Sequence, residues 1–387
     1  MKIMSVVGAR PNFMKIAPFV RALKNENAVR AESGRRPIEH VLVHTGQHYD
    51  ERMSANFFDA LDIPRPEIDL GVGSGTHAEQ VGRTMIAFEP VVQEHRPDWV
   101  VVVGDVNATC ACALTAKKEG VNVAHIEAGL RSRDMSMPEE INRIVTDRLS
   151  DLLFATEDIA CQNLRQEGVP EDRVKRVGNI MIDTLEANRE RAMSLRIEDI
   201  LKENLLDGTP RHAPADNTFA LMTLHRPSNV DHPEILGPMV DFLCREVAEE
   251  MPLIWAIHPR TRKMLESFGL WRRVVDARGV ILLHPLGYID MLRLNMGARI
   301  LLTDSGGLQE ESCVLGTPCI TLRWNTERPV TLVEHGGVSQ LAGNDITTVQ
   351  RLYSEMKARP KIPHIPPLWD GRTAERIVAC FAHLAGC

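Results

Sequence analysis

Unbroken runs of apolar residues alternate along the chain with stretches of helical periodicity. In the first half the runs cover residues 3–7, 40–43, 99–103, 121–126 and 152–155. In the second half they cover residues 219–224, 253–257, 280–284, 300–303 and 319–322. Because the runs are continuous rather than alternating in polarity, each predicts a strand that is buried on both faces. Such strands in alternation with helices predict βαβ units, and therefore parallel sheets covered by helices.

A charged segment separates the two halves. Residues 188–218 begin with a helical pattern and then carry Gly- and Pro-containing turns, which is typical of a surface segment near a domain junction. With 387 residues the chain is long enough for two domains. We expect a first domain at 1–177 and a second at 178–370, each a Rossmann-like, doubly wound α/β sheet, facing each other across a cleft. A last helix at 371–387 is expected to pack back on the first domain.

Composition narrows the class of partner. The net charge of −7 disfavours a nucleic acid, because a phosphate backbone attracts basic surfaces. No apolar run reaches the ~18 residues that a membrane span requires. The eight cysteines include no CxxC pair, and the apolar stretch around Cys110 and Cys112 is typical of a buried helix. These features predict a cytoplasmic protein whose cysteines stay reduced.

The segment after the first predicted strand carries two cations. Ligands of doubly wound sheets bind at the carboxyl ends of the strands, so these segments are the first candidates for a site. Gly8 permits a tight turn and Pro11 suits the first position of the next helix. Arg10 and Lys15 then lie near a helix N-terminus, where the helix dipole disfavours a cation unless an anion binds there. Phosphate contact is the favoured interpretation, and a solvated basic pair is the alternative.

Three acidic residues lie at the ends of neighbouring strands or open the next helix. Asp105 follows the run at 99–103, Glu127 ends the next strand, and Glu139 lies at the start of a later helix. An Asp can cap a helix and a Glu can complement a helix dipole, so Asp105 and Glu139 each have a structural explanation. Glu127 has apolar neighbours, an environment that raises the pKa of a carboxyl. The convergence of the three, rather than any one of them, predicts acid–base chemistry.

The second half carries a glycine-rich turn. Ser305, Gly306 and Gly307 follow a predicted strand, and the N–H groups of such a turn can bind a diphosphate. Glu311 lies about one helical turn further, where its carboxylate can accept both hydroxyls of a ribose. A glycine turn alone is weak evidence for a nucleotide site, so the interpretation depends on its neighbours.

Three further residues of the second half follow predicted strands. His225 comes after the run at 219–224, and Arg328 lies beyond the run at 319–322, where it is available for an anion. Met291 belongs to a segment at 285–291 that can hold a nucleotide base or simply begin a helix. Together with the glycine turn, these positions favour a nucleotide ligand in the second domain.

Patterns for a metal or a resident cofactor are weak. The 14 histidines include no HxH or HExxH pattern. His40, His44 and His48 are spaced four apart, but 40–43 predicts a strand, where that spacing does not form one helical face. No GxGxxG follows the first strand, and no P-loop or GxSxG is present. We expect neither a metal nor a cofactor.

Motifs spread over nearly the whole chain resemble the non-hydrolysing UDP-N-acetylglucosamine 2-epimerases, which have the glycosyltransferase-B (GT-B) type of fold. Several are long and specific, and their order agrees with that family. They are GARPNFMKIAP at 8–18, TGQHYD at 45–50, GDVNAT at 104–109, HIEAGLRS at 125–132, PEEINR at 138–143, LHRPSNV at 224–230, TDSGGLQEE at 303–311 and TERP at 326–329.

The resemblance implies a reaction. Members of this family eliminate UDP across C1–C2 of UDP-N-acetylglucosamine (UDP-GlcNAc). The 2-acetamidoglucal stays bound, and UDP is added back with the C2 proton on the other face, which gives UDP-N-acetylmannosamine (UDP-ManNAc). Such a product is a precursor of surface polysaccharides, and the family implies a homodimer.

The resemblance also implies roles for residues. By motif, the acid–base positions are Asp105, Glu127 and Glu139, and His225 is the histidine that supports departure of UDP. The positions that bind UDP or the sugar are Arg10, Lys15, Arg143, Met291, Ser305, Gly306, Gly307, Glu311 and Arg328.

Three segments depart from the pattern of other members of this family. The chain has GARPNFMKIAP where many bacterial members have GTRPEAIKMAP, and GQHYD where they have AQHR. The segment 71–76 replaces a glutamine-bearing loop. Certain bacterial members form a second, activating sugar-nucleotide site in and near these segments, and the resemblance does not settle whether this chain has one.

Other activities on the same scaffold stay open. They are a hydrolysing epimerase that releases free ManNAc and UDP, an epimerase of UDP-2,3-diacetamido-2,3-dideoxy-glucuronate, a GT-B glycosyltransferase and a non-catalytic nucleotide-sugar sensor. The three acids disfavour the last two, because a glycosyltransferase needs fewer acids near C2 and a sensor predicts the loss of at least one.

Overall fold

The computed structural model of the chain describes residues 1–46, 65–206 and 213–386, except for the side chains of Arg10 and Pro11. It divides into two compact units. The first comprises Met1–Thr184 with Pro366–Cys387, and the second comprises Leu185–Ile365. The division falls inside one helix, α7 (Ile180–Ser194), a few residues beyond the junction that the sequence predicts near residue 178.

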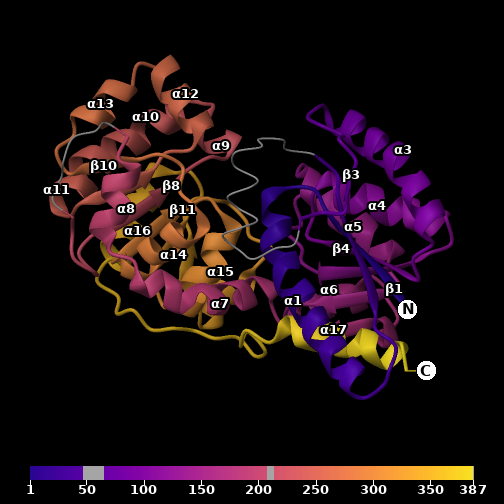
Figure 1. Cartoon of the computed structure of the whole chain (residues 1–387). Helices are drawn as coiled ribbons and strands as arrows, with labels where there is room; N and C mark the ends of the chain where they lie inside the picture. Colours follow the sequence, from indigo (N-terminus) through magenta and orange to yellow (C-terminus); the bar gives the residue numbers. More distant parts are fainter. Residues whose placement is uncertain (47–64, 207–212, 387) are drawn as a thin grey trace. The chain divides into compact units, whose positions relative to one another are not determined.

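The first unit is built on a seven-stranded parallel sheet in the order β3-β2-β1-β4-β5-β6-β7 (Figure 1). Its strands are β1 (Lys2–Val7), β2 (Glu39–His44), β3 (Ile68–Asp69), β4 (Trp99–Val103), β5 (Asn122–Ala128), β6 (Leu152–Ala155) and β7 (Val174–Arg176). Its helices are α1 (Arg10–Glu32), α3 (His77–His95), α4 (Asn107–Lys118), α5 (Pro138–Leu149), α6 (Asp158–Gln166), the 3₁₀ turn η1 (Glu171–Arg173) and α17 (Thr373–Leu384).

The second unit has a six-stranded parallel sheet in the order β10-β9-β8-β11-β12-β13. Its strands are β8 (Ala220–Thr223), β9 (Leu253–Ala256), β10 (Val280–Leu283), β11 (Ile300–Thr303), β12 (Cys319–Thr321) and β13 (Ser339–Leu341). Its helical segments are α8 (Ile197–Asn204), α9 (Pro227–Val230), α10 (Pro233–Phe242), η2 (Leu243–Val247), α11 (Ala248–Glu250), α12 (Pro259–Ser267), α13 (Trp271–Asp276), α14 (Tyr288–Gly297), α15 (Gly306–Leu315), η3 (Pro329–Thr331), η4 (Val333–His335) and α16 (Ile346–Met356).

Both faces of the second sheet are buried, which explains its continuous apolar runs. Along β8, Ala220 and Met222 belong to one hydrophobic cluster, whereas Leu221 belongs to another. Successive side chains of a strand point to opposite faces, so a strand covered by helices on both sides needs an apolar residue at every position. The predicted α/β class with parallel sheets is confirmed.

The sequence does not predict β3 or β13. Both lie at the edge of a sheet, and each has only two or three residues. A strand at an edge pairs on one side only and needs no long apolar run, so the pattern carries no signal for it.

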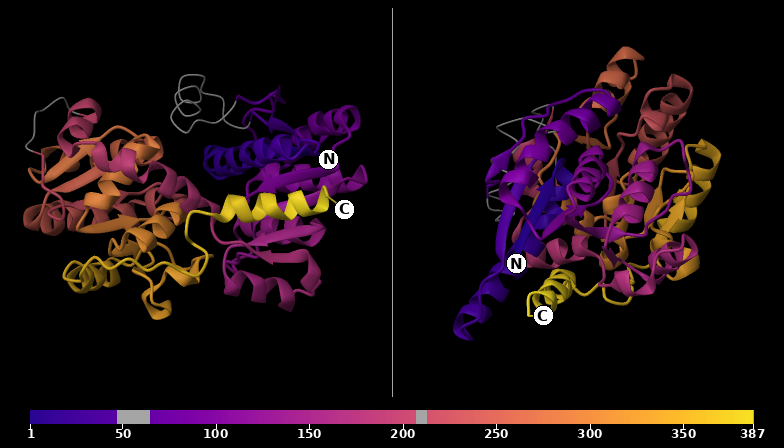
Figure 2. Two further views of the ribbon diagram at one scale, coloured as in Figure 1. Left: turned by 60° about the horizontal axis from the view of Figure 1, so that its bottom comes forward. Right: turned by 90° about the vertical axis from the view of Figure 1, so that its right-hand side faces the viewer.

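The C-terminal helix α17 packs on the first unit. It lies beside α1 in Figure 1 and in both views of Figure 2. Phe381 is fully buried, and its ring packs edge-on against those of Phe19, Trp99 and Phe154 at 5.6–6.1 Å between centroids. Arg30 of α1 also donates to the carbonyl of Ala382 at 2.8 Å. Helix α17 therefore packs into the core formed by α1, β4 and β6.

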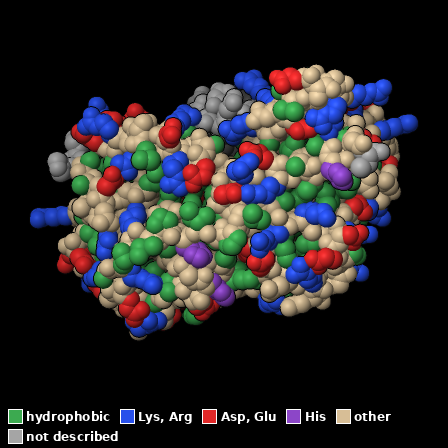
Figure 3. All heavy atoms as spheres, turned by 90° about the horizontal axis from the view of Figure 1, so that it is seen from below, with side chains coloured by type: hydrophobic (Ala, Val, Ile, Leu, Met, Phe, Trp, Pro, Cys, Tyr) green, Lys and Arg blue, Asp and Glu red, His purple; other side chains and the backbone are tan. Residues whose placement is uncertain are grey.

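Charges of both signs lie close together on the molecular surface. On the face shown in Figure 3, Lys and Arg side chains are interspersed with Asp and Glu side chains. None of the helices in the described parts of the chain combines the length and the apolar character needed to span a bilayer.

Candidate functional site

The strand order places a topological switch point in each unit. Strand β1 lies between β2 and β4, and β8 lies between β9 and β11. In each sheet the chain first adds strands on one side of this central strand and then crosses back to add strands on its other side. Ligands of open parallel sheets bind outside the carboxyl ends of the strands at this point. Asp105 follows β4 in the first unit, and His225 and Ser305 follow β8 and β11 in the second. Members of the predicted acid group and of the predicted nucleotide-binding group therefore lie at switch points.

Asp105 is fixed by helix α5. Arg143 donates from Nη1 to Asp105 Oδ2 at 2.5 Å, and Asn142 donates from Nδ2 to the Asp105 carbonyl at 2.9 Å. The Asp105 side chain remains 26% exposed, whereas that of Arg143 is 2% exposed. Asp105 is therefore held in place by an ion pair, with one edge of its carboxyl group accessible.

Glu140 holds Arg143 from the other side. Its Oε2 accepts from Nη2 of Arg143 at 2.8 Å, and its two oxygens accept from the N–H groups of Ser132 and Arg133. Burial would raise the pKa of Glu140, but these N–H groups and Arg143 outweigh it and leave the pKa below its ordinary value. Sequence reasoning missed this role, although the spacing of Glu140 to Arg143 is that of neighbours on one helical face. Glu139, the predicted acid, is exposed in the first turn of α5.

Glu127 lies at a backbone irregularity of β5. Its φ is +75°, and the pairing with β6 shifts register between Ile126 and Ala128. A bulge of this kind re-aims a side chain, and strain at a non-glycine residue persists only where the surroundings hold it. Glu127 is buried and forms an ion pair with Lys15, which is also buried. The structure therefore pairs Lys15, predicted to bind the diphosphate or sugar, with one of the acids.

Gly104 makes room for this ion pair. Its φ is +68°, and a Cβ atom there would lie 3.2 Å from Lys15 Nζ and 3.4 Å from Glu127 Oε2. A side chain at position 104 would thus press on both charged groups.

Asn12 joins the loop after β1 to the end of β4. Its Oδ1 accepts from the N–H groups of Gly8 and Ala9, and its Nδ2 donates to the Val103 carbonyl at 2.9 Å. Asn12 is 2% exposed, so it is a fixed part of the scaffold. Asn12 belongs to the motif at 8–18, but the sequence alone indicates no role for it. The side chain of Arg10 and residues 47–50 of the TGQHYD motif lie outside the described residues.

In the second unit His225 is oriented by Asp304. His225 Nδ1 lies 2.6 Å from Asp304 Oδ1, and the histidine side chain is 40% exposed. Asp304 Oδ2 also accepts from the N–H groups of His225 and Arg226. Burial would raise the pKa of Asp304, but the hydrogen bonds from His225 and Arg226 outweigh it and lower the pKa. Because Nδ1 of His225 contacts the Asp304 carboxylate, Nε2 is the ring nitrogen that can contact a ligand. Asp304 follows a buried strand directly, and that signal could have identified it.

The glycine turn begins helix α15. Ser305 is its N-cap residue, and its hydroxyl lies 3.5 Å from the N–H of Leu308. A Cβ atom on Gly306 would lie 3.1 Å from Glu327 Oε1 and 3.2 Å from Arg328 Nη1, whereas one on Gly307 would meet no atom within 4 Å. Gly306 therefore lets the turn approach the loop that contains Arg328, and the N-terminus of α15 is suited to an anion.

Arg328 is bound by carboxylates. It forms ion pairs with Glu310 of α15 and with its neighbour Glu327, and Arg323 pairs with Glu327 at 2.6 Å. All four side chains are at most 7% exposed. Arg328 was predicted to be available for an anion, and in this structure such an anion would compete with two glutamates.

Glu311 lies on α15 among groups that disfavour its charge. Burial raises its pKa to about 8, a hydrogen bond with Tyr288 lowers it, and the nearby Glu310 raises it. Met291 of α14 is half-buried and packs on the same hydrophobic cluster as Leu308 of α15. The elements that carry Met291 and Glu311 are thus joined through one core.

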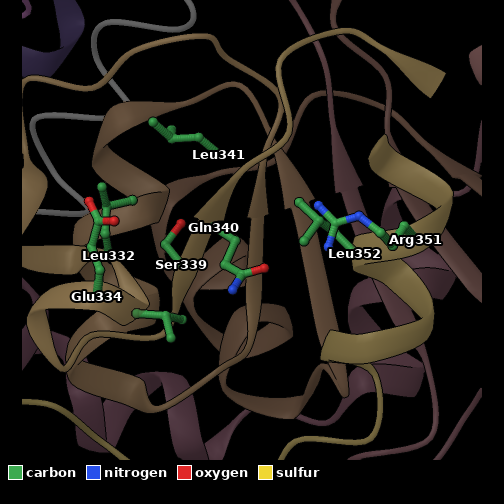
Figure 4. A pocket seen from close by; sticks show the side chains of 8 residues that line it. Leu332, Glu334, Ser339, Gln340, Leu341, Arg351 and Leu352 are labelled. Carbon is green, nitrogen blue, oxygen red and sulfur yellow. The ribbon is translucent and has the colours of Figure 1, made fainter. Parts of the chain in front are cut away.

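A separate hollow of about 420 Å³ lies on the second unit (Figure 4). It is lined by Leu332, Val333, Glu334, Ser339, Gln340, Leu341, Arg351 and Leu352. None of the residues predicted for the site lines it. Within the described ranges, no group of three or more His, Cys, Asp or Glu side chains is arranged to hold a metal ion.

Comparison with known proteins decides the family. Residues 30–382 match the model of the UDP-N-acetylglucosamine 2-epimerase family. The chain belongs to this family. It is 40% identical over 380 residues to a UDP-N-acetylglucosamine 2-epimerase of Methanocaldococcus jannaschii, with 98% of each chain covered. The resemblance found in the sequence is confirmed.

A second relative and a solved structure extend this comparison. The chain is 38% identical over 329 residues to a UDP-2,3-diacetamido-2,3-dideoxy-D-glucuronate 2-epimerase of Pseudomonas aeruginosa, with 84% of each covered. Its fold is similar to the crystal structure of the Methanocaldococcus jannaschii UDP-GlcNAc 2-epimerase in complex with UDP-GlcNAc and UDP, with a TM-score of 0.86 and 39% identity. That comparison covers 99% of this chain and 100% of the other. The family consists of epimerases, so the predicted isomerase class is confirmed.

Proposed function

We propose that this chain is a non-hydrolysing UDP-GlcNAc 2-epimerase, which interconverts UDP-GlcNAc and UDP-ManNAc for surface polysaccharide synthesis. The observation that carries this proposal is the pair of carboxylate–cation contacts at the ends of adjacent strands. Asp105, which follows β4, pairs with Arg143, and Glu127 of β5 pairs with Lys15. Family membership supports the substrate.

The chemistry of C2 explains why UDP has to leave. C2 of the sugar is not adjacent to a carbonyl, so its proton is too weakly acidic for direct removal. When a carboxylate takes this proton, the electron pair forms the C1–C2 double bond and the C1–O bond to UDP breaks. Addition of UDP to C1 of the 2-acetamidoglucal, with a proton delivered to the other face of C2, completes the epimerisation. The cycle consumes no oxidant and no reductant.

The acids of the first unit are proposed to handle the proton. Asp105, Glu127 and Glu139 take the acid–base positions, without an assignment of each to one face of C2. Arg143 and Lys15 stabilise the carboxylate forms of Asp105 and Glu127, and a base has to be ionised. Lys15 and Arg10 are also proposed to contact the sugar or the diphosphate.

The second unit is proposed to bind UDP. The N-terminus of α15, with Ser305, Gly306 and Gly307, receives the diphosphate. Glu311 accepts from the ribose hydroxyls. His225 presents Nε2 to the leaving phosphate and supports its departure by donating a proton or a hydrogen bond.

Two further residues complete the proposed UDP site. Arg328 contributes its cation to the nucleotide, and Met291 contacts the uracil. Both lie on elements that pack against α15 through the contacts described above.

A second substrate is favoured by one relative. The Pseudomonas aeruginosa protein that is named for UDP-2,3-diacetamido-2,3-dideoxy-D-glucuronate is nearly as similar to this chain as the Methanocaldococcus protein. The same elimination and addition at C1–C2 would act on that sugar, which differs at C3 and C6.

Product analysis separates these candidates. The purified protein is incubated with each UDP-sugar, and the products are followed by NMR and anion-exchange chromatography. The proposal predicts that UDP-GlcNAc and UDP-ManNAc reach the same ratio from either side. Free ManNAc with stoichiometric UDP would instead show a hydrolysing epimerase, and turnover of the diacetamido sugar alone would assign that substrate.

We also propose a cytoplasmic homodimer. The cysteines within the described residues are all free, which suits a reducing compartment. Light scattering coupled to gel filtration distinguishes the dimer from the 43.3 kDa monomer.

A further inference from the structure

His125 is a buried histidine that contacts two hydrogen-bond acceptors. It lies in β5 with 0% exposure, two residues before Glu127. Its Nδ1 lies 2.6 Å from Asp147 Oδ1, and its Nε2 lies 2.8 Å from the carbonyl oxygen of Gly104. A carbonyl oxygen has no proton to donate, so Nε2 has to carry one.

Asp147 is held as a carboxylate, so Nδ1 carries a proton as well. Asp147 Oδ2 accepts from the N–H of Gly129 at 3.0 Å and lies 2.7 Å from Nη1 of Arg131. Burial would raise the pKa of Asp147, but His125 and Arg131 outweigh it and lower the pKa. Both ring nitrogens of His125 therefore face acceptors.

The two residues join every segment that carries a predicted acid. The Gly104 carbonyl precedes Asp105. His125 precedes Glu127 on β5, and Gly129 follows the end of that strand. Asp147 lies on α5, the helix that carries Glu139 and, with Arg143, also holds Asp105. One buried ion pair therefore ties the loop after β4, the bulge of β5 and helix α5 together.

We propose that His125 and Asp147 form a positioning pair that fixes the acids of the site, with His125 held as a doubly protonated imidazolium. Neither residue touches the reacting atoms. The inference rests on the proposed epimerase function for its effect on turnover, but the protonation of His125 can be observed without any substrate.

The surrounding charges are balanced, which allows the buried imidazolium. Arg131 is neutralised by Glu167 as well as by Asp147. On the neighbouring elements, Arg143 pairs with Asp105 and Glu140, and Lys15 pairs with Glu127. Strands β4 and β6 carry no ionisable side chain, and the lysines of α4 lie at its last turn, where Lys117 pairs with Asp151. A buried charge is tolerated where partners of opposite sign and hydrogen bonds surround it.

The spectroscopic test needs no substrate. Histidines are labelled with ¹⁵N, and the signals of His125 are assigned by their loss in His125→Gln. We expect both ring nitrogens of His125 to show the shifts of protonated nitrogen at neutral pH. An unprotonated nitrogen in His125 would overturn the proposal, whatever the enzyme does.

The kinetic test uses Asp147→Asn, which keeps the shape of the side chain and removes its charge. Without the carboxylate the ring of His125 keeps one proton, and the charged contacts that tie α5 to His125 and Arg131 are lost. The loop that carries Asp105 shifts, and a misplacement of about 1 Å can cost ~100-fold in rate. We expect kcat to fall by about that factor while the Kd of UDP, which the second unit is proposed to bind, stays unchanged.

Asp151→Asn is the matched control. Asp151 accepts from the N–H of Val123 at 2.9 Å and from Lys117, so it holds the other end of the same strand β5. We expect this variant to keep the wild-type kcat. Asp147→Asn with wild-type kcat, or an equal loss in both variants, would overturn the proposal. If the wild-type protein epimerises no UDP-sugar, the proposed function fails, and the NMR result still decides the state of His125.

Discussion

Three buried or half-buried carboxyl groups of the candidate site, those of Asp105, Glu127 and Glu311, occupy two kinds of environment. Asp105 and Glu127 each pair with a buried cation, whereas Glu311 lies beside a tyrosine hydroxyl and a second glutamate. A cation favours the ionised carboxyl, and burial beside another acid favours the neutral one. The first environment suits a proton acceptor, and the second suits a group that ionises when a ligand supplies hydrogen-bond donors.

Asp105→Asn tests the proton chemistry at the residue scale. The amide cannot take or give the C2 proton, and general acid–base catalysis contributes typically ~10²–10⁴-fold. We expect kcat to fall by about that range and the Kd of UDP, measured by calorimetry, to stay unchanged. Asp98→Asn is the control, because Asp98 is exposed at the other end of β4 and bonds the Lys2 N–H at 2.7 Å. Wild-type turnover in Asp105→Asn would remove Asp105 from the acid–base set.

Glu311 is expected to release a proton when UDP binds. Its pKa is raised to about 8 by burial, so the carboxyl is mostly protonated at pH 7 without UDP. Ribose hydroxyls that donate to it favour the ionised form. Calorimetry in buffers of different ionisation enthalpy should therefore detect proton release, and Glu311→Gln should abolish it. Identical enthalpies in all buffers for the wild-type protein would contradict this role.

The same shift fixes the sign of a stability effect. Between the ordinary pKa of 4.5 and about 8, the folded chain binds more protons at Glu311 than the unfolded chain. The contribution of Glu311 to the free energy of unfolding is therefore largest at low pH and falls as the pH rises through this window. Comparison of urea midpoints of the wild type and Glu311→Gln at pH 5 and pH 8.5 measures it.

At the scale of elements, strands are predictable from the sequence and side-chain partners are not. The apolar runs predict the central strands, because a strand buried on both faces needs apolar residues throughout. The motif TERP predicts the position of Arg328 but not its ion pairs with Glu310 and Glu327. Such pairs depend on which side chains the folded helices bring together, and Glu310 lies on α15, a different element.

The sequence assigns roles to Asp105 and Glu127 but not to the groups that hold them. The bulge at Glu127 has a positive φ that no periodicity indicates, and Asn12 and His125 act through backbone carbonyls that are distant in sequence. Convergence at the carboxyl ends of strands was predictable from the topology of doubly wound sheets. The network behind the acids was not, because its members are distant in sequence and only the folded chain brings them together.

Gly306→Ala tests the approach of α15 to the Arg328 loop. The added methyl would lie 3.1 Å from Glu327 and 3.2 Å from Arg328, so it displaces the charged groups beneath the turn. We expect a Kd for UDP about tenfold higher, the equivalent of roughly 1.4 kcal/mol. Gly307→Ala is the comparison, because its methyl meets no atom within 4 Å and the N–H group remains. A loss at 307 equal to or larger than that at 306 would contradict the steric explanation.

On the scale of the whole molecule, each unit contains a switch point with its own set of candidate residues. The acids belong to the unit that α17 completes, and the glycine turn belongs to the unit between Leu185 and Ile365. Under the proposed function, substitutions in the first unit should mainly change kcat, and those in the second should mainly change the affinity for UDP.

Phe381→Ala tests the contribution of the C-terminal helix to the first unit. Removal of a fully buried phenylalanine typically costs ~3–5 kcal/mol of stability. Phe381 touches Phe19, Trp99 and Phe154, so we expect the urea midpoint of unfolding, followed by tryptophan fluorescence, to fall markedly. Leu384→Ala in the same helix removes a side chain that is 43% exposed and should change the midpoint little. Equal effects of the two would show that α17 does not pack as the structure describes.

The most direct test of the proposed function follows the C2 hydrogen. The protein is incubated with UDP-GlcNAc in heavy water, and C2 is observed by NMR while the products are identified. Elimination and re-addition predict that UDP-ManNAc appears with deuterium at C2 and that the sugar stays linked to UDP. Epimerised product with protium retained at C2, or neither exchange nor product with UDP-GlcNAc and with the diacetamido-glucuronate substrate, would contradict it.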